Sequence, residues 1–173
     1  SLTLDNGAST PAVSVYSGTH TLDTTLSGSS GIAVSTASGA LLILSTNAAV
    51  NTDLTLAQGS VELRGNAALS AAALGASTLL RINATNAALG SLSGLTNAQL
   101  ALAGTSAKLT LTQSADATFS GYLRGDGGAL VKKGSATLTL DAPATVYSGR
   151  TDVAAGTPAP KTTPLAGAVS VAS

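Results

Sequence analysis

Short triplets, in which two apolar residues flank a middle residue that is usually polar, recur along the whole chain. Such alternation places successive side chains on opposite faces, as in a half-buried β-strand. The triplets follow one another at intervals of roughly 7–12 residues, with Gly, Asn or Ser-Gly between them. The pattern therefore predicts an all-β chain built from many short strands. The clearest triplets are Val13–Ser14–Val15, Leu42–Ile43–Leu44, Leu54–Thr55–Leu56, Val61–Glu62–Leu63, Leu80–Arg81–Ile82, Leu100–Ala101–Leu102, Leu109–Thr110–Leu111 and Leu138–Thr139–Leu140.

Regular short strands suit a sandwich, a barrel or a solenoid, and three features favour the solenoid. The strand residues are small to medium aliphatics, which stack as ladders from turn to turn. Hairpin dipeptides are scarce, since only Asn6–Gly7 and Asp126–Gly127 are present. Asn, Ser and Thr are spread over the bends, where their side chains bond the backbone. We predict a right-handed, single-stranded parallel β-helix with about 20–25 residues per turn.

Two segments depart from this pattern. Residues 66–76 are rich in Ala and Leu, which are good helix formers, but the flanking strands and Gly75 favour a rung with small residues. The stretch Pro158–Pro164 holds three of the five prolines and is expected to be a linker or a sheet edge. We therefore divide the chain into a β-helix, residues 1–157, and a Pro-rich tail, residues 158–173, in which residues 166–171 are a candidate for one further strand.

The composition narrows the range of partners. Charged residues make up 9% of the chain and aromatic residues 2%, whereas an average globular domain has about 25% charged residues. Eight acidic residues balance eight basic ones, which argues against binding to nucleic acid or to an acidic membrane surface. No run of 18 apolar residues is present, so we expect no membrane insertion of this segment. The absence of cysteine suits a chain that crosses an oxidising periplasm.

Residues 119–157 contain a distinctive series of glycine-punctuated strands. The series reads F-S-G-x-L, a Gly-rich turn, L-x-K-x-G, T-L-x-L and Y-x-G-x-T-x-V-x-x-G-T. It resembles the C-terminal repeat of bacterial autotransporter passengers. Two places depart from that repeat: Ala142–Pro143–Ala144, where a Gly/Asn turn is usual, and Pro158, where the family usually has Leu. The matching residues are Phe119, Ser120, Gly121, Leu123, Gly125, Gly127, Leu130, Lys132, Gly134, Thr137, Leu138, Leu140, Tyr147, Gly149, Thr151, Val153, Gly156 and Thr157.

The resemblance implies a function as well as a fold. In autotransporters the C-terminal passenger repeat leaves the outer-membrane pore first, folds first and seeds turn-by-turn folding of the rest, as an autochaperone. It implies that this chain is displayed on a Gram-negative cell surface, with its own outer-membrane β-barrel translocator as a partner. Phe119 and Tyr147 are the expected large anchors. The expected folding-seed residues are Phe119, Gly121, Lys132, Gly134, Leu138, Leu140, Tyr147, Gly149, Val153 and Gly156.

Catalytic and metal-binding patterns are sparse. A nucleophilic serine needs a base, but His20 is the only histidine, no G-x-S-x-G segment occurs, and we interpret His20 as a solvated loop residue. With one His, no Cys and no calcium-loop spacing, we expect no metal and no cofactor. Glycan-cleaving β-helices need paired carboxylates, and the acids here are scattered singly, Asp5 and Asp23 being the pair about one turn apart. We expect no enzyme.

Arg124–Gly125–Asp126 is the tripeptide that integrins recognise on some adhesins. Against this, the repeat itself calls for a Gly-rich turn at these positions. The charged patch that these residues form with Lys132 and Lys133 is also typical of a solvated turn that discourages sideways strand pairing. Two functions stay open: a secreted stalk with an autochaperone segment, or an adhesin that binds host surface receptors or its own copies through a Thr/Ser/Asn face. A surface-binding solenoid would need a Thr-x-Thr ladder of constant period, which the sequence lacks.

Overall fold

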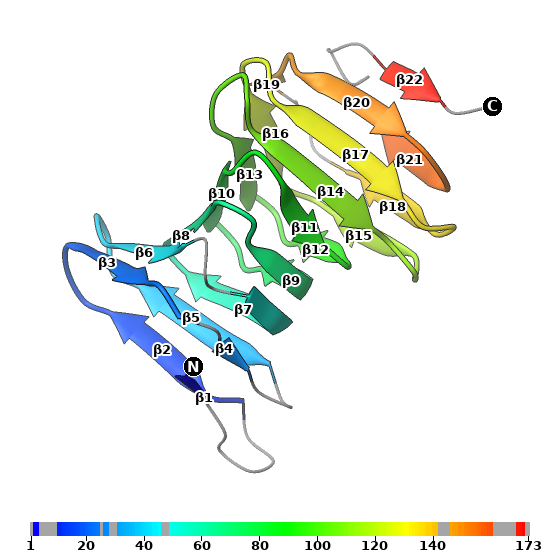
Figure 1. Cartoon of the computed structure of the whole chain (residues 1–173). Coiled ribbons are helices and arrows are strands. Elements are labelled where there is room, and N and C mark those ends of the chain that lie inside the picture. The colour runs from blue at the N-terminus through cyan, green and yellow to red at the C-terminus, as the bar shows by residue number, and fades with distance from the viewer. Residues whose placement is uncertain are drawn as a thin grey trace.

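The computed structural model describes residues 2–3, 10–24, 26–27, 31–45, 49–141, 146–160 and 169–171. In these residues the chain forms strands and turns and no helix, and every strand pairing is parallel. The chain winds into turns that stack along one axis, with its two ends at opposite ends of the stack (Figure 1). The predicted all-β parallel solenoid is confirmed.

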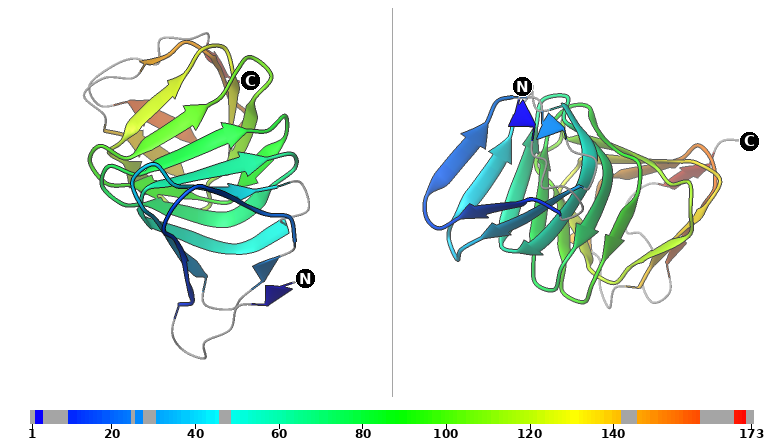
Figure 2. Two further views of the ribbon diagram at one scale, coloured as in Figure 1. Left: turned by 90° about the vertical axis from the view of Figure 1, so that its left-hand side faces the viewer. Right: turned by 90° about the horizontal axis from the view of Figure 1, so that it is seen from below.

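One side of the solenoid is a seven-stranded sheet that takes one strand from each turn (Figure 2). Its register is regular: Leu42 pairs with Val61, 19 residues later, and Leu100 pairs with Leu123, 23 residues later. The turns of this sheet are thus slightly shorter at their minimum than the 20–25 residues that we predicted. In chain order its strands are β3 (Thr19–Leu22), β6 (Leu41–Leu44), β8 (Ser60–Arg64), β10 (Leu79–Asn83), β13 (Gln99–Leu102), β16 (Tyr122–Gly125) and β19 (Val146–Tyr147).

The other two sides belong to a thirteen-stranded sheet. It begins with β2 (Ala12–Val15) and β5 (Ile32–Thr36), continues through the long strands β7 (Ala49–Gln58) and β9 (Ala68–Leu74), and then divides into two faces. The first face holds β11 (Ala87–Leu89), β14 (Lys108–Thr112), β17 (Ala129–Lys133), β20 (Arg150–Val153) and β22 (Val169–Val171). The second face holds β12 (Leu92–Gly94), β15 (Ala117–Phe119), β18 (Thr137–Leu140) and β21 (Thr157–Pro160). A separate small sheet pairs β1 (Leu2–Thr3) with β4 (Leu26–Ser27).

Aliphatic ladders fill the interior. On the seven-stranded sheet one ladder stacks Leu42, Val61, Leu80, Leu100 and Leu123 in register, and each of these side chains is fully buried. Burying one such side chain contributes roughly 1.5–3 kcal/mol, so the repetition of the ladder stabilises the stack. The triplets therefore place their outer residues inward, as their alternation predicts.

The two atypical segments are both strands where they are described. Residues 68–74 form β9 rather than a helix, because their apolar side chains alternate inward in register with the ladders of β7 and β12. In the tail, Thr157–Pro160 forms the edge strand β21 and Val169–Val171 pairs with β20. Residues 161–168, Asn6–Gly7 and Ala142–Pro143–Ala144 lie outside the described residues. Within the described part of the chain, no helix is long and apolar enough to span a membrane.

Candidate functional site

Phe119 occupies a corner of the solenoid that only glycine neighbours leave open. The ring is 1% exposed and lies in register with Gly94 of the preceding turn. A Cβ atom at Gly94 would lie 2.6 Å from two ring carbons of Phe119. A Cβ at Gly121 would lie 2.8 Å from the ring and 2.2 Å from the carbonyl oxygen of Ala98. The F-S-G sequence is therefore a packing unit, in which Gly121 lets the chain turn closely over the ring that it follows.

Tyr147 forms a second unit of the same kind one turn further on. Its side chain is fully buried, and its hydroxyl lies 2.9 Å from the carbonyl oxygen of Gly128 and 2.6 Å from that of Arg150. A Cβ at Gly149 would lie 2.5 Å from the tyrosine ring and 2.0 Å from the Gly128 oxygen. Burial raises the pKa of the Tyr147 phenol above its usual value. The phenol therefore stays protonated and can donate to the backbone of two successive turns.

Lys132 points into the interior. It lies in register between Leu111 of the preceding turn and Val153 of the next, and it is 1% exposed. Its Nζ atom donates to the carbonyl oxygens of Lys133, at 2.7 Å, and Gly134, at 3.0 Å. Burial lowers the pKa of this ammonium. The interpretation of Lys132 as part of a solvated charged turn is therefore wrong, because only Lys133 is exposed.

Glycines close the corner around this ammonium. Gly134 has a φ of +79°, and a Cβ there would lie 2.0 Å from the carbonyl oxygen of Gln113. A Cβ at Gly156 would lie 2.9 Å from Lys132 Nζ and 2.3 Å from the Gly134 oxygen. The three residues therefore form one turn whose backbone carbonyls converge on a single cation.

The remaining predicted seed residues belong to the same turns. Leu138 and Leu140 face inward on β18, where Leu140 is in register with Phe119, and Val153 is buried on β20. The structure thus brings all ten predicted seed residues into consecutive turns, nine of them inside or at the corners and Gly156 on an exposed bend.

Gln113 is a buried polar residue of this region that the sequence reasoning did not single out. Its side-chain Oε1 accepts a hydrogen bond from the backbone nitrogen of Leu92 at 3.2 Å, and its Nε2 donates to the carbonyl oxygen of Ala115 at 2.9 Å. It therefore links two turns. The signal for it was its position two residues after Leu111, in phase with the inward side chains of β14.

Arg124, Gly125 and Asp126 end β16 on the outward face of the seven-stranded sheet. Arg124 and Asp126 are exposed, and the Arg124 guanidinium lies 5.3 Å from the centroid of the Tyr122 ring. Gly125 has a φ of +141°, and a Cβ there would lie 2.4 Å from the Leu102 carbonyl oxygen, so the backbone itself requires this glycine. The tripeptide borders a shallow hollow of about 430 Å³, which is lined by Leu79, Arg81, Gln99, Ala101, Leu102, Ala103, Gly104, Arg124, Gly125 and Asp126.

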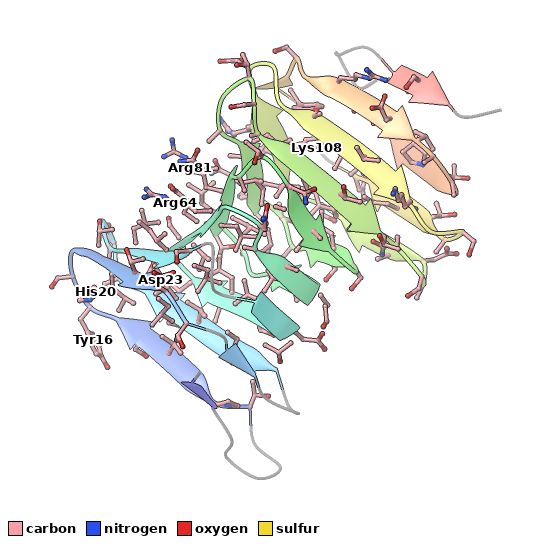
Figure 3. All side chains as sticks on the ribbon, in the orientation of Figure 1. Tyr16, His20, Asp23, Arg64, Arg81 and Lys108 are labelled. Carbon is pink, nitrogen blue, oxygen red and sulfur yellow. The ribbon has the colours of Figure 1, made fainter. Side chains whose placement is uncertain are left out.

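A charged cluster surrounds Glu62 on the same outward face. Glu62 is 2% exposed, and its carboxylate accepts from Arg64 Nε at 2.5 Å and from Asn83 Nδ2 at 3.1 Å, with Arg81 Nε at 3.6 Å. Figure 3 shows Arg64 and Arg81 side by side, pointing away from the solenoid. Burial alone would raise the pKa of Glu62, but these hydrogen bonds and the two arginine charges together lower it. The carboxylate is fully engaged in this cluster, as in a structural ion pair.

The other candidate chemical groups lie apart. His20 is exposed at the N-terminal end of the stack, near Tyr16, and its Nε2 lies 3.1 Å from the carbonyl oxygen of Ser17 (Figure 3). It belongs to strand β3 rather than to a loop, although it is solvated as predicted. Within the described ranges, no group of three His, Asp or Glu residues is close enough to hold a metal ion. Asp5, the predicted neighbour of Asp23, lies outside the described residues.

Comparisons of the chain with protein-family models, with curated proteins and with solved structures found no match. The resemblance of residues 119–157 to the autotransporter repeat therefore stays a prediction from the sequence.

Proposed function

We propose that this chain is a segment of an extracellular β-helical stalk from an autotransporter passenger, and that residues 119–157 seed its folding. The parallel β-solenoid fits a stalk or an adhesin module. The resemblance to the passenger repeat supports secretion through the protein's own outer-membrane translocator and display at the cell surface. We propose no catalytic role for it.

The observation that carries this proposal is the interior of residues 119–157. A solenoid turn cannot bury its apolar face alone, so folding needs one region that is stable enough to act as a template. Phe119, Lys132 and Tyr147 are large, unlike one another and fully buried in neighbouring turns, and each fits a corner shaped by glycine. These contacts make this region the best-specified template in the described chain.

Refolding kinetics test the seed. Phe119→Leu and Tyr147→Phe alter the proposed seed conservatively, and Ile82→Val makes a similar change in a buried ladder outside it. If residues 119–157 are folded in the transition state, the two seed variants slow refolding, whereas Ile82→Val mainly speeds unfolding. Stopped-flow refolding of the full chain measures both rates. Slower refolding of Ile82→Val with unchanged refolding of both seed variants would contradict the proposal.

The exposed tripeptide favours a second candidate, an adhesin. Arg124 and Asp126 are accessible beside a hollow, so a partner could contact both charges. Asp126→Glu keeps the charge but moves it, and we expect it to leave folding unchanged and to lower binding to host cells. Asp53→Glu, at another exposed acid, is the matched control. Equal adhesion of the wild type and both variants would retire the tripeptide as a binding site.

A further inference from the structure

The strand β21 ends one face of the thirteen-stranded sheet. It pairs with β18 on one side, and no strand of the described residues pairs with its other side. Two of its four residues are prolines, Pro158 and Pro160. Their positions in the register decide which hydrogen bonds the free edge can make.

Backbone N–H groups on this face point in a direction set by the side chain. Ala33 and Asp141 each neighbour inward residues, and they donate to the preceding turn, to Pro11 at 2.9 Å and to Phe119 at 3.0 Å. The inward residue Ala72 donates the other way, to Ser91 of the following turn at 2.9 Å. Alternate residues of a strand bond to opposite neighbours, so this division holds along each strand.

Pro158 and Pro160 occupy inward positions, since they are in register with Leu138 and Leu140. An N–H at these two positions would therefore point away from β18, toward the next strand to be added. Proline has no N–H. The prolines thus leave the bonds between β21 and β18 intact and remove the donors of the free edge alone.

The opposite end of the same face is differently constituted. There β2 is the edge strand, and its outward residues Ala12 and Ser14 are exposed, with N–H groups that by the same rule point away from β5. Two copies stacked head to tail would place β2 of one copy on β21 of the other, parallel and in phase. Such a head-to-tail contact does not close on itself and produces filaments.

We propose that Pro158 and Pro160 close the β21 edge against the β2 edge of a second copy and so prevent head-to-tail stacking of the solenoid. An incoming β2 strand would find acceptors on β21 but lose its two donors, which leaves buried carbonyl oxygens unpaired. Proline on edge strands is one of the ways in which natural sheets avoid edge-to-edge association. This inference does not depend on the proposed stalk or seed.

The test restores the donors in the full chain. In Pro158→Val/Pro160→Val both positions regain an N–H and a residue that favours strands. We expect sedimentation velocity to show species larger than the wild type that grow with concentration, and electron microscopy to show filaments. The matched control is Thr157→Val/Ala159→Val, which adds the same side chains to β21 at outward positions, where the N–H groups already face β18. The control should sediment like the wild type.

A third arm blocks the other edge. Ser14→Pro in the Pro158→Val/Pro160→Val background removes a donor from β2 and should reverse the association. If circular dichroism shows that the double valine variant has lost β-structure, Pro158→Ala and Pro160→Ala each restore one donor and should associate partially. Wild-type sedimentation of every donor-restoring variant overturns the proposal. So does equal association of the wild type or the control, which would indicate pairing through a lateral face.

Discussion

The turns before β15 and the turns formed by residues 119–157 are built on the same backbone but have different interiors. In the earlier turns the largest fully buried side chains are leucines and isoleucines, such as Leu54, Leu80 and Ile82, which stack like upon like. In the later turns they are Tyr147, Phe119 and Lys132, which resemble neither one another nor their ladder neighbours. An aliphatic ladder accepts a leucine at any rung, so it stabilises the stack but specifies register weakly. The later side chains each fit one place, so they fix the register of the turns around them.

Truncation of the two aromatic anchors is the strongest way to break this comparison. We expect Phe119→Ala and Tyr147→Ala each to lower the free energy of unfolding by about 3–5 kcal/mol, because the glycine-lined corners cannot collapse onto the space that the rings leave. Chemical denaturation followed by circular dichroism measures the loss. Leu80→Ala, in a ladder of the earlier turns, is the control and should cost about 2–5 kcal/mol. Unchanged unfolding midpoints for the two aromatic variants would show that neither ring anchors the C-terminal turns.

Removal of the buried ammonium should have a smaller effect. Lys132→Met keeps an unbranched chain of similar length between Leu111 and Val153 but leaves the carbonyl oxygens of Lys133 and Gly134 without their donor. We expect a loss of about 1–3 kcal/mol in the free energy of unfolding, the cost of leaving buried acceptors unpaired. The adjacent Lys133→Met changes an exposed lysine and should stay within about 0.5 kcal/mol of the wild type. If both substitutions are equally silent, the Lys132 corner does not specify the turn.

The two interiors also differ in how far the sequence predicts them. The triplet of Leu80, Arg81 and Ile82 contains all the information that its ladder needs, because period-2 alternation defines the inward face and every inward neighbour is aliphatic. The same alternation, from Leu130 to Lys132, predicts that Lys132 faces inward, yet the charge favours a solvated turn. What reverses that preference is the convergence of backbone carbonyls at Gly134, which arises from the fold and not from local sequence.

Tertiary contacts likewise explain what the sequence could not give for the candidate sites. The glycines of F-S-G and Y-x-G were predicted as turn residues, whereas their closest contacts are with the aromatic rings, at Gly121 and Gly149. Glu62 was one of eight scattered acids, and its partners Arg81 and Asn83 come from the next turn, some twenty residues away. Register between turns brings such residues together, and register is the property that a single sequence specifies least well.

The smallest expected effect contrasts the two regions through pH. The pKa of Glu62 is lowered in the folded protein, so its carboxylate stabilises the fold above the unfolded-state pKa near 4.5, and this contribution is lost as the pH falls through the folded-state value. Tyr147 behaves oppositely: its raised pKa gives a contribution that is present below about pH 10 and lost as the pH rises through the folded-state value.

Glu62→Gln isolates the acid limb of this behaviour. The variant keeps the shape of the side chain but has no carboxylate for Arg64 and Arg81, whose guanidinium groups are about half exposed and so screened by water. We expect it to lose on the order of 1 kcal/mol at pH 7 and the gap to the wild type to narrow as the pH falls below 4.5. Tyr147→Phe should show no such narrowing in acid and should instead approach the wild type above about pH 10. A gap for Glu62→Gln that is constant from pH 7 to pH 3 would mean that the Glu62 charge does not stabilise the earlier turns, and that the ladders alone hold them.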